Sequence, residues 1–389
     1  MVNALTVYAA ADFSAEPPGN GAGALVQRFE AALAAQDWPC GIVFGPESLL
    51  AEQYEASPYL VRQALRILEA RGLGRMRRGS PGGLQLHLPT ARMTAQAMML
   101  HLSAVGVTSQ QVAASRRQVQ NYWPQGASSR ATQFIDTMLQ ELDHCFVEEE
   151  EGTKADDLSP NRALGVARRI VRDARSGIRG RGTDVPLGTI EDLCDRYHSC
   201  RPVMTQAVRI MEDFELVTLM RGRSGGLRLR SPSSSMITRV TYGHFAAQQI
   251  VSDHASEIIW AANTASAVRA AERSAHDLAE LRHLRDLMTP QAFMAGTPWG
   301  QIATFRCLAD RAGDPVLHMI LRCFFVYKFR AGMIPFPRIS HPHARRIVDT
   351  TNGMIDAVMR GRSDLAEQAV TDCRQSMHDW HFSDGAARV

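Results

Sequence analysis

The chain has 389 residues, of which 45% are hydrophobic, and a formal net charge of +3 at pH 7. This length and apolar content allow two or three buried cores. The balance is only mildly basic, which excludes a histone-like excess of positive charge.

The chain has seven cysteines, none of them in a C-x-x-C pair, so we expect reduced thiols and a cytoplasmic location. No basic segment precedes the short apolar stretch at the amino terminus. No run reaches about 18 apolar residues. We therefore expect neither a secretion signal nor a membrane span.

A loose tail is expected at residues 1–22, and residues 23–90 then have the pattern of helices followed by two short strands. Glu47 to Tyr54 predicts one short helix, and Ser57 is the expected N-cap of the next, with Pro58 at its first position. Gly72 ends that helix. The two strands that follow are joined by a basic turn, Arg78-Gly79-Ser80-Pro81-Gly82-Gly83.

Part of this unit occurs twice. Residues 54–86 align without a gap on residues 197–229 at a constant offset of 143 (206 − 63 = 143). The positions that recur identically are Tyr54, Gln63, Ala64, Arg66, Ile67, Glu69, Leu73, Arg78, Gly79, Gly82, Gly83, Leu84 and Leu86. Two copies of one supersecondary unit indicate a duplicated module, with the second copy at residues 161–232.

The rest of the chain is predicted to be helical. Residues 91–147 are rich in helix formers and predict a short helical segment, with helices at 93–104, 109–122 and 128–146. Residues 148–160 predict an acidic linker, and residues 236–389 predict an all-helical domain. The fold class is therefore mainly α, with two winged helix-turn-helix domains that carry small β-hairpins and one helical bundle.

A helix-turn-helix followed by a basic hairpin is suited to DNA, because the second helix fits the major groove and the hairpin brings arginines to phosphate. The alternative is a small α/β unit whose arginines only solvate its surface. Further arginines crowd the helix that leads into the second copy: Arg162, Arg168, Arg169, Arg172, Arg175, Arg179 and Arg181.

The segment PESLLAEQYEASPYLVRQALRILEARGLG resembles the winged-helix domain of GntR-type bacterial transcription regulators. The resemblance implies contacts with bases and phosphates from an arginine straight after the N-cap and from another in the motif VRE. The first copy has Pro58 at the first position and keeps Arg62 at the second. The second copy keeps Arg201 at the first and has Thr205 at the second. Any DNA contact is therefore expected to be shared between the copies, unless one copy is now only structural.

Two later segments, Phe305 to Leu317 and Met354 to Met377, resemble the FCD ligand-binding domain of the fatty-acid-regulator-like subfamily. The resemblance implies a helical bundle around a small-molecule pocket with a metal at its base. The positions that match its metal ligands are Ile302, Arg306, Gly353 and Gln375. These side chains do not replace imidazole and carboxylate ligands, so we expect neither a metal nor another cofactor. Arg306 could instead hold an anionic effector, or form an internal salt bridge.

The expected function is a transcription regulator, not an enzyme, that binds double-stranded DNA and forms a homodimer. An anionic ligand or a partner at the helical domain would modulate binding. The alternative is a co-regulator or interaction protein whose winged helices have lost specific DNA binding. The candidate DNA-binding residues are Ser57, Tyr59, Arg62, Gln63, Arg66, Arg77, Arg78, Gly79, Arg201, Thr205, Gln206, Arg209, Arg221 and Arg223.

Overall fold

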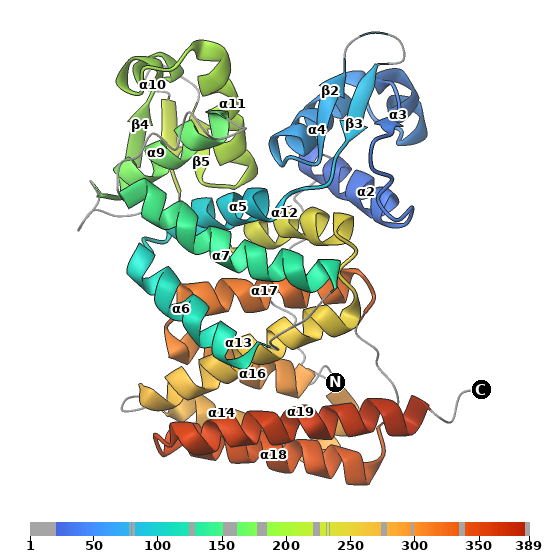
Figure 1. Ribbon diagram of the computed structural model, residues 1–389, viewed down its shortest axis with the longest axis vertical. Coiled ribbons are helices and arrows are strands. Elements are labelled where there is room, and N and C mark those ends of the chain that lie inside the picture. The colour runs from blue at the N-terminus through green and yellow to red at the C-terminus, as the bar shows by residue number, and fades with distance from the viewer. Residues whose placement is uncertain are drawn as a thin grey trace. The chain divides into compact units, whose positions relative to one another are not determined.

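The computed structural model (Figure 1) describes residues 21–77, 79, 82–123, 129–150, 162–176, 185–220, 226–230, 232, 234–273, 278–296, 299–333 and 339–385. It is mainly helical, with two three-stranded antiparallel sheets. The chain divides into two compact units. We call Pro17–Ala113 with Ala127–Ile250 the winged unit, and Ala114–Gly126 with Val251–Val389 the helical unit.

The first copy in the winged unit consists of α2 (Ala22–Ala34), β1 (Val43–Phe44), α3 (Glu47–Gln53), α4 (Pro58–Ala70), β2 (Gly74–Arg77) and β3 (Gly83–Leu86). The strands are antiparallel in the order β1-β3-β2. Apolar residues at helical spacing on α4 face a core formed by α2, α3 and the sheet. Its fully buried side chains are Val26, Phe29, Val61, Ala64, Leu65, Leu68, Leu73, Leu84 and Leu86.

The second copy consists of α9 (Arg162–Ser176), β4 (Val185–Gly188), α10 (Ile190–Arg196), α11 (Arg201–Asp213), β5 (Val217–Met220) and β6 (Gly226–Leu229). Its strand order, β4-β6-β5, is the same. Both ends of α10, α11, β5 and β6 lie 143 residues after those of α3, α4, β2 and β3 (201 − 58 = 143). The two small sheets with their helices are compatible with two winged helices.

The structural repeat extends beyond the segment in which identities are dense. The next helices, α5 (Ala91–Ala104) and α12 (Ser234–Ala247), also match at both ends (234 − 91 = 143). Each ends in a left-handed residue, Gly106 or Gln249. The helices that follow, α6 (Ser109–Tyr122) and α13 (Ser252–Glu272), begin at the same offset. The duplicated module therefore contains at least one helix after each hairpin.

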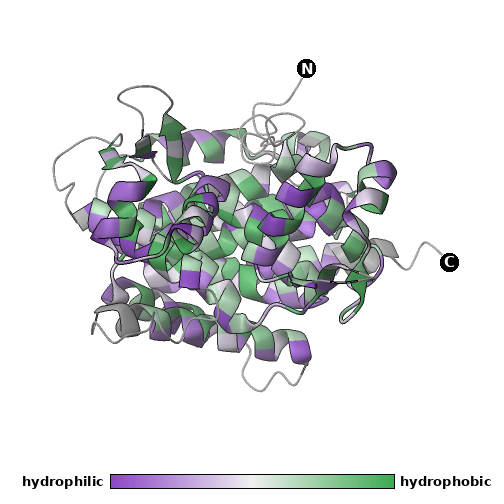
Figure 2. Ribbon diagram, turned by 90° about the horizontal axis from the view of Figure 1, so that it is seen from above, coloured by the Kyte–Doolittle hydropathy of each residue, from purple (hydrophilic) through white to green (hydrophobic). Residues whose placement is uncertain are grey.

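The helices expected between the two copies are present. They are α5, α6 and α7 (Arg130–Glu150), and α7 packs along α5. The expected tail at residues 1–22 lies almost wholly outside the described residues, and the linker at 148–160 lies outside them from residue 151 on. Hydrophobic and hydrophilic residues alternate along the helices (Figure 2).

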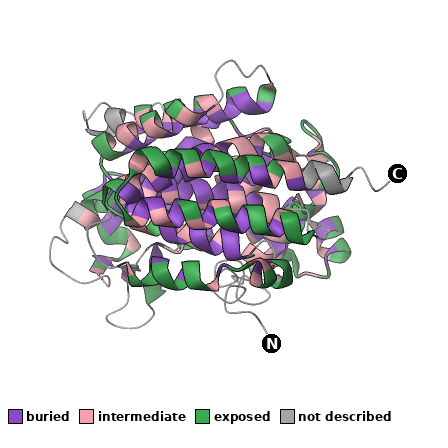
Figure 3. Ribbon diagram, turned by 90° about the horizontal axis from the view of Figure 1, so that it is seen from below, coloured by how far each residue is buried: buried purple, intermediate pink, exposed green. Residues whose placement is uncertain are grey.

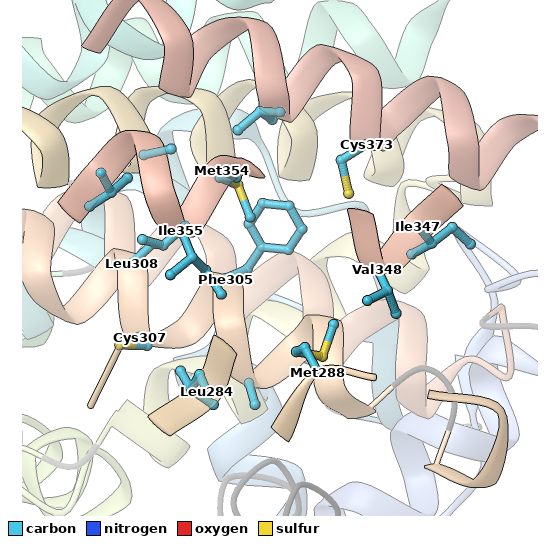
Figure 4. Close-up of a cluster of buried hydrophobic side chains, with 14 of the residues drawn as sticks. Leu284, Met288, Phe305, Cys307, Leu308, Ile347, Val348, Met354, Ile355 and Cys373 are labelled. Atoms are coloured by element: carbon cyan, nitrogen blue, oxygen red, sulfur yellow. The ribbon is translucent and has the colours of Figure 1, made fainter. Parts of the chain in front are cut away.

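The helical unit is built around α13. This helix packs against α16 (Trp299–Ala312), α17 (Pro315–Arg330), α18 (His341–Met359) and α19 (Ser363–Gly385), while α14 (Ala279–Leu287) and α15 (Pro290–Gly296) pack against α16 and α18. One face of α18 and α19 is exposed and the opposite face is buried (Figure 3). Figure 4 shows part of the core of this unit, in which Phe305 of α16 lies beside Met354 and Ile355 of α18.

A buried polar network ties α6 to the helical unit. The hydroxyl of Ser115 donates to the carboxylate of Asp314 at 2.7 Å, and Arg269 pairs with the same carboxylate at 3.1 Å. Asp314 also accepts from the first backbone N–H groups of α17, at Val316 and Leu317. The carboxylate therefore caps one helix and holds two others.

Candidate nucleic-acid interface

In the first copy, the second helix of the expected helix-turn-helix, α4, presents a polar face to solvent. In α4, Ser57 is the N-cap and accepts from the backbone N–H of Leu60 at 3.2 Å. Tyr59 is 68% exposed, and its hydroxyl accepts from the side-chain amide of Gln63 at 2.9 Å. Arg66 is exposed and makes no ion pair or hydrogen bond among the described residues. The four predicted residues Ser57, Tyr59, Gln63 and Arg66 therefore lie on α4 or at its N-cap. They offer a hydroxyl cap, an aromatic ring, an amide and a cation.

Arg62, the fifth predicted residue of α4, is held by a carboxylate. Its guanidinium pairs with Glu47, in the first turn of α3, at 2.9 Å. The hydrogen bond and the charge of Glu47 raise the pKa of Arg62. Sequence reasoning missed Glu47, although a glutamate in the first turn of the preceding helix, within reach of the second helix, was a visible signal.

In the second copy, Arg201, Thr205, Gln206 and Arg209 lie along α11. Arg201 is 71% exposed and pairs with Glu191, in the first turn of α10, at 2.6 Å. Each copy thus has one arginine near the amino end of its second helix, paired with one glutamate from the helix before. The positions are not equivalent, because Arg62 corresponds to Thr205 and Arg201 corresponds to Pro58.

The two second helices line one groove of about 760 Å³, which we call the inter-helix groove. It brings together most of the predicted DNA-binding residues of both helices. Equivalent residues contribute from the two sides: Gln63 with Gln206, Arg66 with Arg209, Ile67 with Ile210, and Glu69 with Glu212. Burial raises the pKa of Glu212, and the nearby Arg209 lowers it to a smaller extent. The groove is therefore lined by the same polar face of both copies.

The packing between the copies is reciprocal. Helix α2 of the first copy packs on α12 of the second, and α9 of the second packs on α5 of the first. The equivalent pairs α4 with α11 and α5 with α12 also pack against each other. Each contact made by the first copy on the second thus has an equivalent contact made by the second copy on the first. This pattern is that of two copies related by a pseudo-two-fold axis.

An ion-pair cluster without a symmetric counterpart joins the carboxyl ends of α4 and α11. Arg71 follows α4, and its guanidinium binds both carboxylate oxygens of Asp213 at 2.9 and 3.0 Å. It also donates to Glu30 of α2 at 2.9 Å. Burial lowers the pKa of Arg71, but the two carboxylates outweigh it, and the net pKa is raised. A cation at two helix carboxyl ends also offsets their negative dipoles.

Sequence reasoning missed this cluster because its partners are distant along the chain. The available signal was a mismatch within the repeat. Arg71 stands where the second copy has Phe214, and Asp213 stands where the first copy has Ala70. Here the two charges that are each present in only one copy pair with each other between the copies.

His244 supports the same junction from α12. Its Nε2 lies 2.7 Å from the carbonyl oxygen of Arg71, and its Nδ1 lies 2.9 Å from the hydroxyl of Thr94. The pKa of His244 is lowered to about 4, mainly by burial. The hydrogen bond to the carbonyl of Arg71 raises this pKa, and the positive charge of Arg71 lowers it. The ring is therefore neutral near pH ~7, with Nε2 donating to the carbonyl and Nδ1 accepting from the threonine.

The hairpins keep the backbone geometry that the repeated glycines suggested. Gly83 and Gly226 are equivalent, with φ of 148° and 150°. A Cβ on Gly83 would lie 2.3 Å from the carbonyl oxygen of Gly45, and one on Gly226 would lie 2.9 Å from that of Gly188. Only glycine fits this approach of the third strand to the first.

The predicted hairpin residues are only partly visible. Arg77 is exposed at the end of β2, and Gly79 follows with φ of 100°. The predicted Arg78, Arg221 and Arg223 lie outside the described residues.

Several arginines of α9 are engaged inside their own module. Arg168 is buried, Arg169 lies over the ring of Tyr197, and Arg175 donates to the carbonyl of Arg230 at 2.8 Å. These residues stabilise the second winged helix, so their crowding in the sequence reflects packing as well as charge.

In the helical unit, the four positions compared with metal ligands do not converge on an interior site. Gly353 and Gln375 are exposed, and Arg306 is partly exposed beside Asp310, 3.9 Å away. Among the described residues there is no group of three histidine, cysteine, aspartate or glutamate side chains that could hold a metal ion.

The buried polar residues of these helices lie one or two positions away. Gln301 donates to the thiol of Cys373 at 2.8 Å, and Thr351 lies 3.6 Å from the same sulfur. Burial raises the pKa of Cys373. The structure therefore turns Gln301, Thr351 and Cys373 inward, and sequence reasoning missed them because the helix phase was set by motif spacing alone.

Comparison with solved structures gives distant likenesses only. The structure is similar to a solved structure of GntR from Streptococcus agalactiae, with 13% sequence identity and a TM-score of 0.36, over 56% of this chain and 99% of that one. No protein-family model matches the chain, and no curated protein matches its sequence.

None of the helices that the structure describes combines the length and the apolar character needed to cross a membrane.

Proposed function

We propose that this chain is a DNA-binding transcription regulator that contacts double-stranded DNA with both of its winged helices. The observation that carries the proposal is the inter-helix groove, which polar residues of α4 and α11 line together within a single unit. The groove brings equivalent arginines and glutamines of the two copies together, Arg66 with Arg209 and Gln63 with Gln206.

The proposed contacts divide into two classes. Hairpin residues Arg77, Arg78, Arg221 and Arg223 contact phosphates and position the protein. Residues near the amino ends of α4 and α11, chiefly Arg62 and Arg201, reach base edges in the major groove. Glu47 and Glu191 fix the direction of these two guanidinium groups before DNA arrives, which lowers the entropy cost of an ordered contact.

For the helical unit we propose a role in modulating DNA binding. An anionic effector at Arg306 would have to compete with the carboxylate of Asp310, which this cation already faces. The homodimer expected from the GntR resemblance would then carry four winged helices. A cytoplasmic location is supported by the cysteines, none of which forms a disulfide among the described residues; Cys40 and Cys200 are exposed.

A second candidate function is a co-regulator that binds protein and no longer binds DNA specifically. The observation that favours it is that Arg62 and Arg201 are both neutralised by glutamates. The carboxylates of Glu47 and Glu191, which lie beside the second helices, would also repel phosphates.

A gel shift on the promoter region of its own gene, repeated at rising salt, separates these functions. A DNA-binding regulator gives a shift whose affinity falls steeply with salt, because arginines on phosphate release counterions. Arg62→Ala should weaken binding by about 1–3 kcal/mol at one sequence, whereas Arg78→Ala should weaken all sequences about equally. If no duplex is bound at low salt, the co-regulator function is favoured.

A further inference from the structure

The relation between the two winged helices bears on how DNA would be bound. In a tandem duplication the copies can be related by a translation along the DNA or by a two-fold rotation. Translation places the front of one copy against the back of the next, so that contacting residues are not equivalent. A two-fold rotation places equivalent residues opposite each other.

The contacts within the winged unit are those of a two-fold rotation. Equivalent residues face each other across the inter-helix groove, and the exchanged pairs α2 with α12 and α9 with α5 are reciprocal. DNA-binding dimers with this symmetry bind two half-sites in inverted orientation. Here both halves belong to one chain.

The size of the unit allows both second helices to reach one duplex. Each helix has 13 residues and is therefore about 20 Å long. The ion pair of Arg71 with Asp213 joins their carboxyl ends, so their amino ends lie no more than roughly 45 Å apart. This limit leaves room for the ~34 Å that separates two half-sites one DNA turn apart.

The two halves nevertheless differ at the positions that would reach bases. The first copy offers Tyr59 and Arg62, and the second offers Pro202 and Thr205 at the equivalent positions. The second copy has Arg201 instead, at the first helical position, where the first copy has Pro58. An arginine displaced by four residues moves by about one helical turn, or ~5 Å along the helix, and so addresses a different base pair.

We infer that a single chain occupies a complete operator, and that this operator is an inverted repeat whose two half-sites differ in sequence. This inference rests on the proposed DNA binding. Arg62 specifies one half-site and Arg201 the other, while Gln63, Gln206, Arg66 and Arg209 make the contacts that the two halves share.

The test begins with selection of bound duplexes from a random-sequence library by the full-length chain. The expected motif has two inverted, non-identical halves at one fixed spacing. Native mass spectrometry with the selected duplex in excess should give a ratio of one chain to one duplex, which for a homodimer means two bound duplexes. A direct repeat, or a perfect palindrome that is filled only by two chains, would overturn the inference while leaving DNA binding intact. Failure to select any duplex would overturn the proposed function as well.

Variants then assign the halves. Arg62→Ala should lower affinity about tenfold or more for duplexes with an intact first half and relax selection there only. Arg201→Ala should do the same for the other half. Arg345→Ala, which removes an exposed arginine of α18, should change neither, and serves as the matched control. Equal loss of specificity in both halves from either arginine variant would contradict the assignment.

Discussion

The two copies in the winged unit, each compatible with a winged helix, have similar backbones and obtain similar contacts from different residues. Their turns contain a left-handed residue at equivalent positions, Glu55 and His198, and their helices and hairpins end 143 residues apart (198 − 55 = 143). The equivalent glycines Gly83 and Gly226 allow the same close approach of strands. Backbone geometry has therefore changed less than side chains.

The side-chain contacts show how the copies have diverged. Tyr54 and Tyr197 are equivalent, and each has a guanidinium over its ring, from Arg28 at 5.2 Å and from Arg169 at 5.9 Å. Their helices, α2 and α9, do not keep the offset of 143, because they begin 140 and end 142 residues apart (162 − 22 = 140; 176 − 34 = 142). The Glu47–Arg62 and Glu191–Arg201 pairs form the same kind of contact from residues that are not equivalent. Relative to the repeat, the arginine has moved by four residues, about one turn of helix, and the glutamate by one.

The largest effect is expected where the two copies differ most, at the ion-pair cluster of Arg71 with Glu30 and Asp213, which has no counterpart on the other side of the pseudo-two-fold axis. Arg71→Met removes the cation and leaves the carboxylates of Glu30 and Asp213 buried, which should cost about 3–5 kcal/mol of unfolding free energy. Urea denaturation followed by circular dichroism measures the loss.

The control is Arg172→Met in the same unit, where an exposed arginine pairs with Asp173 and should contribute less than about 1 kcal/mol. Combining Arg71→Met with Asp213→Ala and Glu30→Met should recover most of the stability, because an apolar junction has no charge to leave unpaired. Equal losses from Arg71→Met and Arg172→Met would show that the cluster does not join the copies.

A smaller effect is expected from pH at His244. An unfolded histidine binds a proton below its usual pKa of 6.5, whereas His244 binds one only near pH 4. The stabilisation is therefore complete above pH 6.5 and is lost as pH falls toward 4. Between pH ~7 and pH ~5 the loss should be about 2 kcal/mol.

His244→Gln removes this titration. Its unfolding free energy should be lower than that of the parent near pH ~7 and should vary less between pH ~7 and pH ~5. Denaturation of both proteins at the two pH values measures the difference in slope. An unchanged slope in the variant would assign the pH dependence to other groups.

Local sequence signals predicted most of the elements and little of what joins them. Ser57, Pro58 and Gly72 marked the ends of α4 because capping depends on residues within one turn. Arg71 and Asp213 could not be paired in this way, because their contact depends on how two modules pack. In the helical unit, motif spacing placed Gln375 where a ligand was expected, but the phase of α19 turns Cys373 inward. A shift of two residues on a helix reverses its faces.

The smallest expected effects concern the side-chain helix caps, which lie on different helices in the two copies. In the first copy, α4 has a side-chain cap at Ser57, whereas α3 begins after Pro46 with none. In the second copy, α10 has a capping box formed by Thr189 and Asp192, whereas α11 begins after Cys200 with none. Each helix-turn-helix thus has one capped and one uncapped helix, in opposite order.

A cap bond satisfies a backbone N–H that the helix itself leaves unpaired, so removing it should cost about 1 kcal/mol. Ser57→Ala should therefore destabilise the chain by about this amount. Cys200→Ser gives α11 the residue that α4 has, in the same extended backbone conformation, and should stabilise the chain by about 0.5–1 kcal/mol. Cys200→Ala is the matched control and should change little, because neither side chain accepts from the helix. If Cys200→Ser is no more stable than Cys200→Ala, the backbone of the second copy does not offer the geometry that the first copy uses.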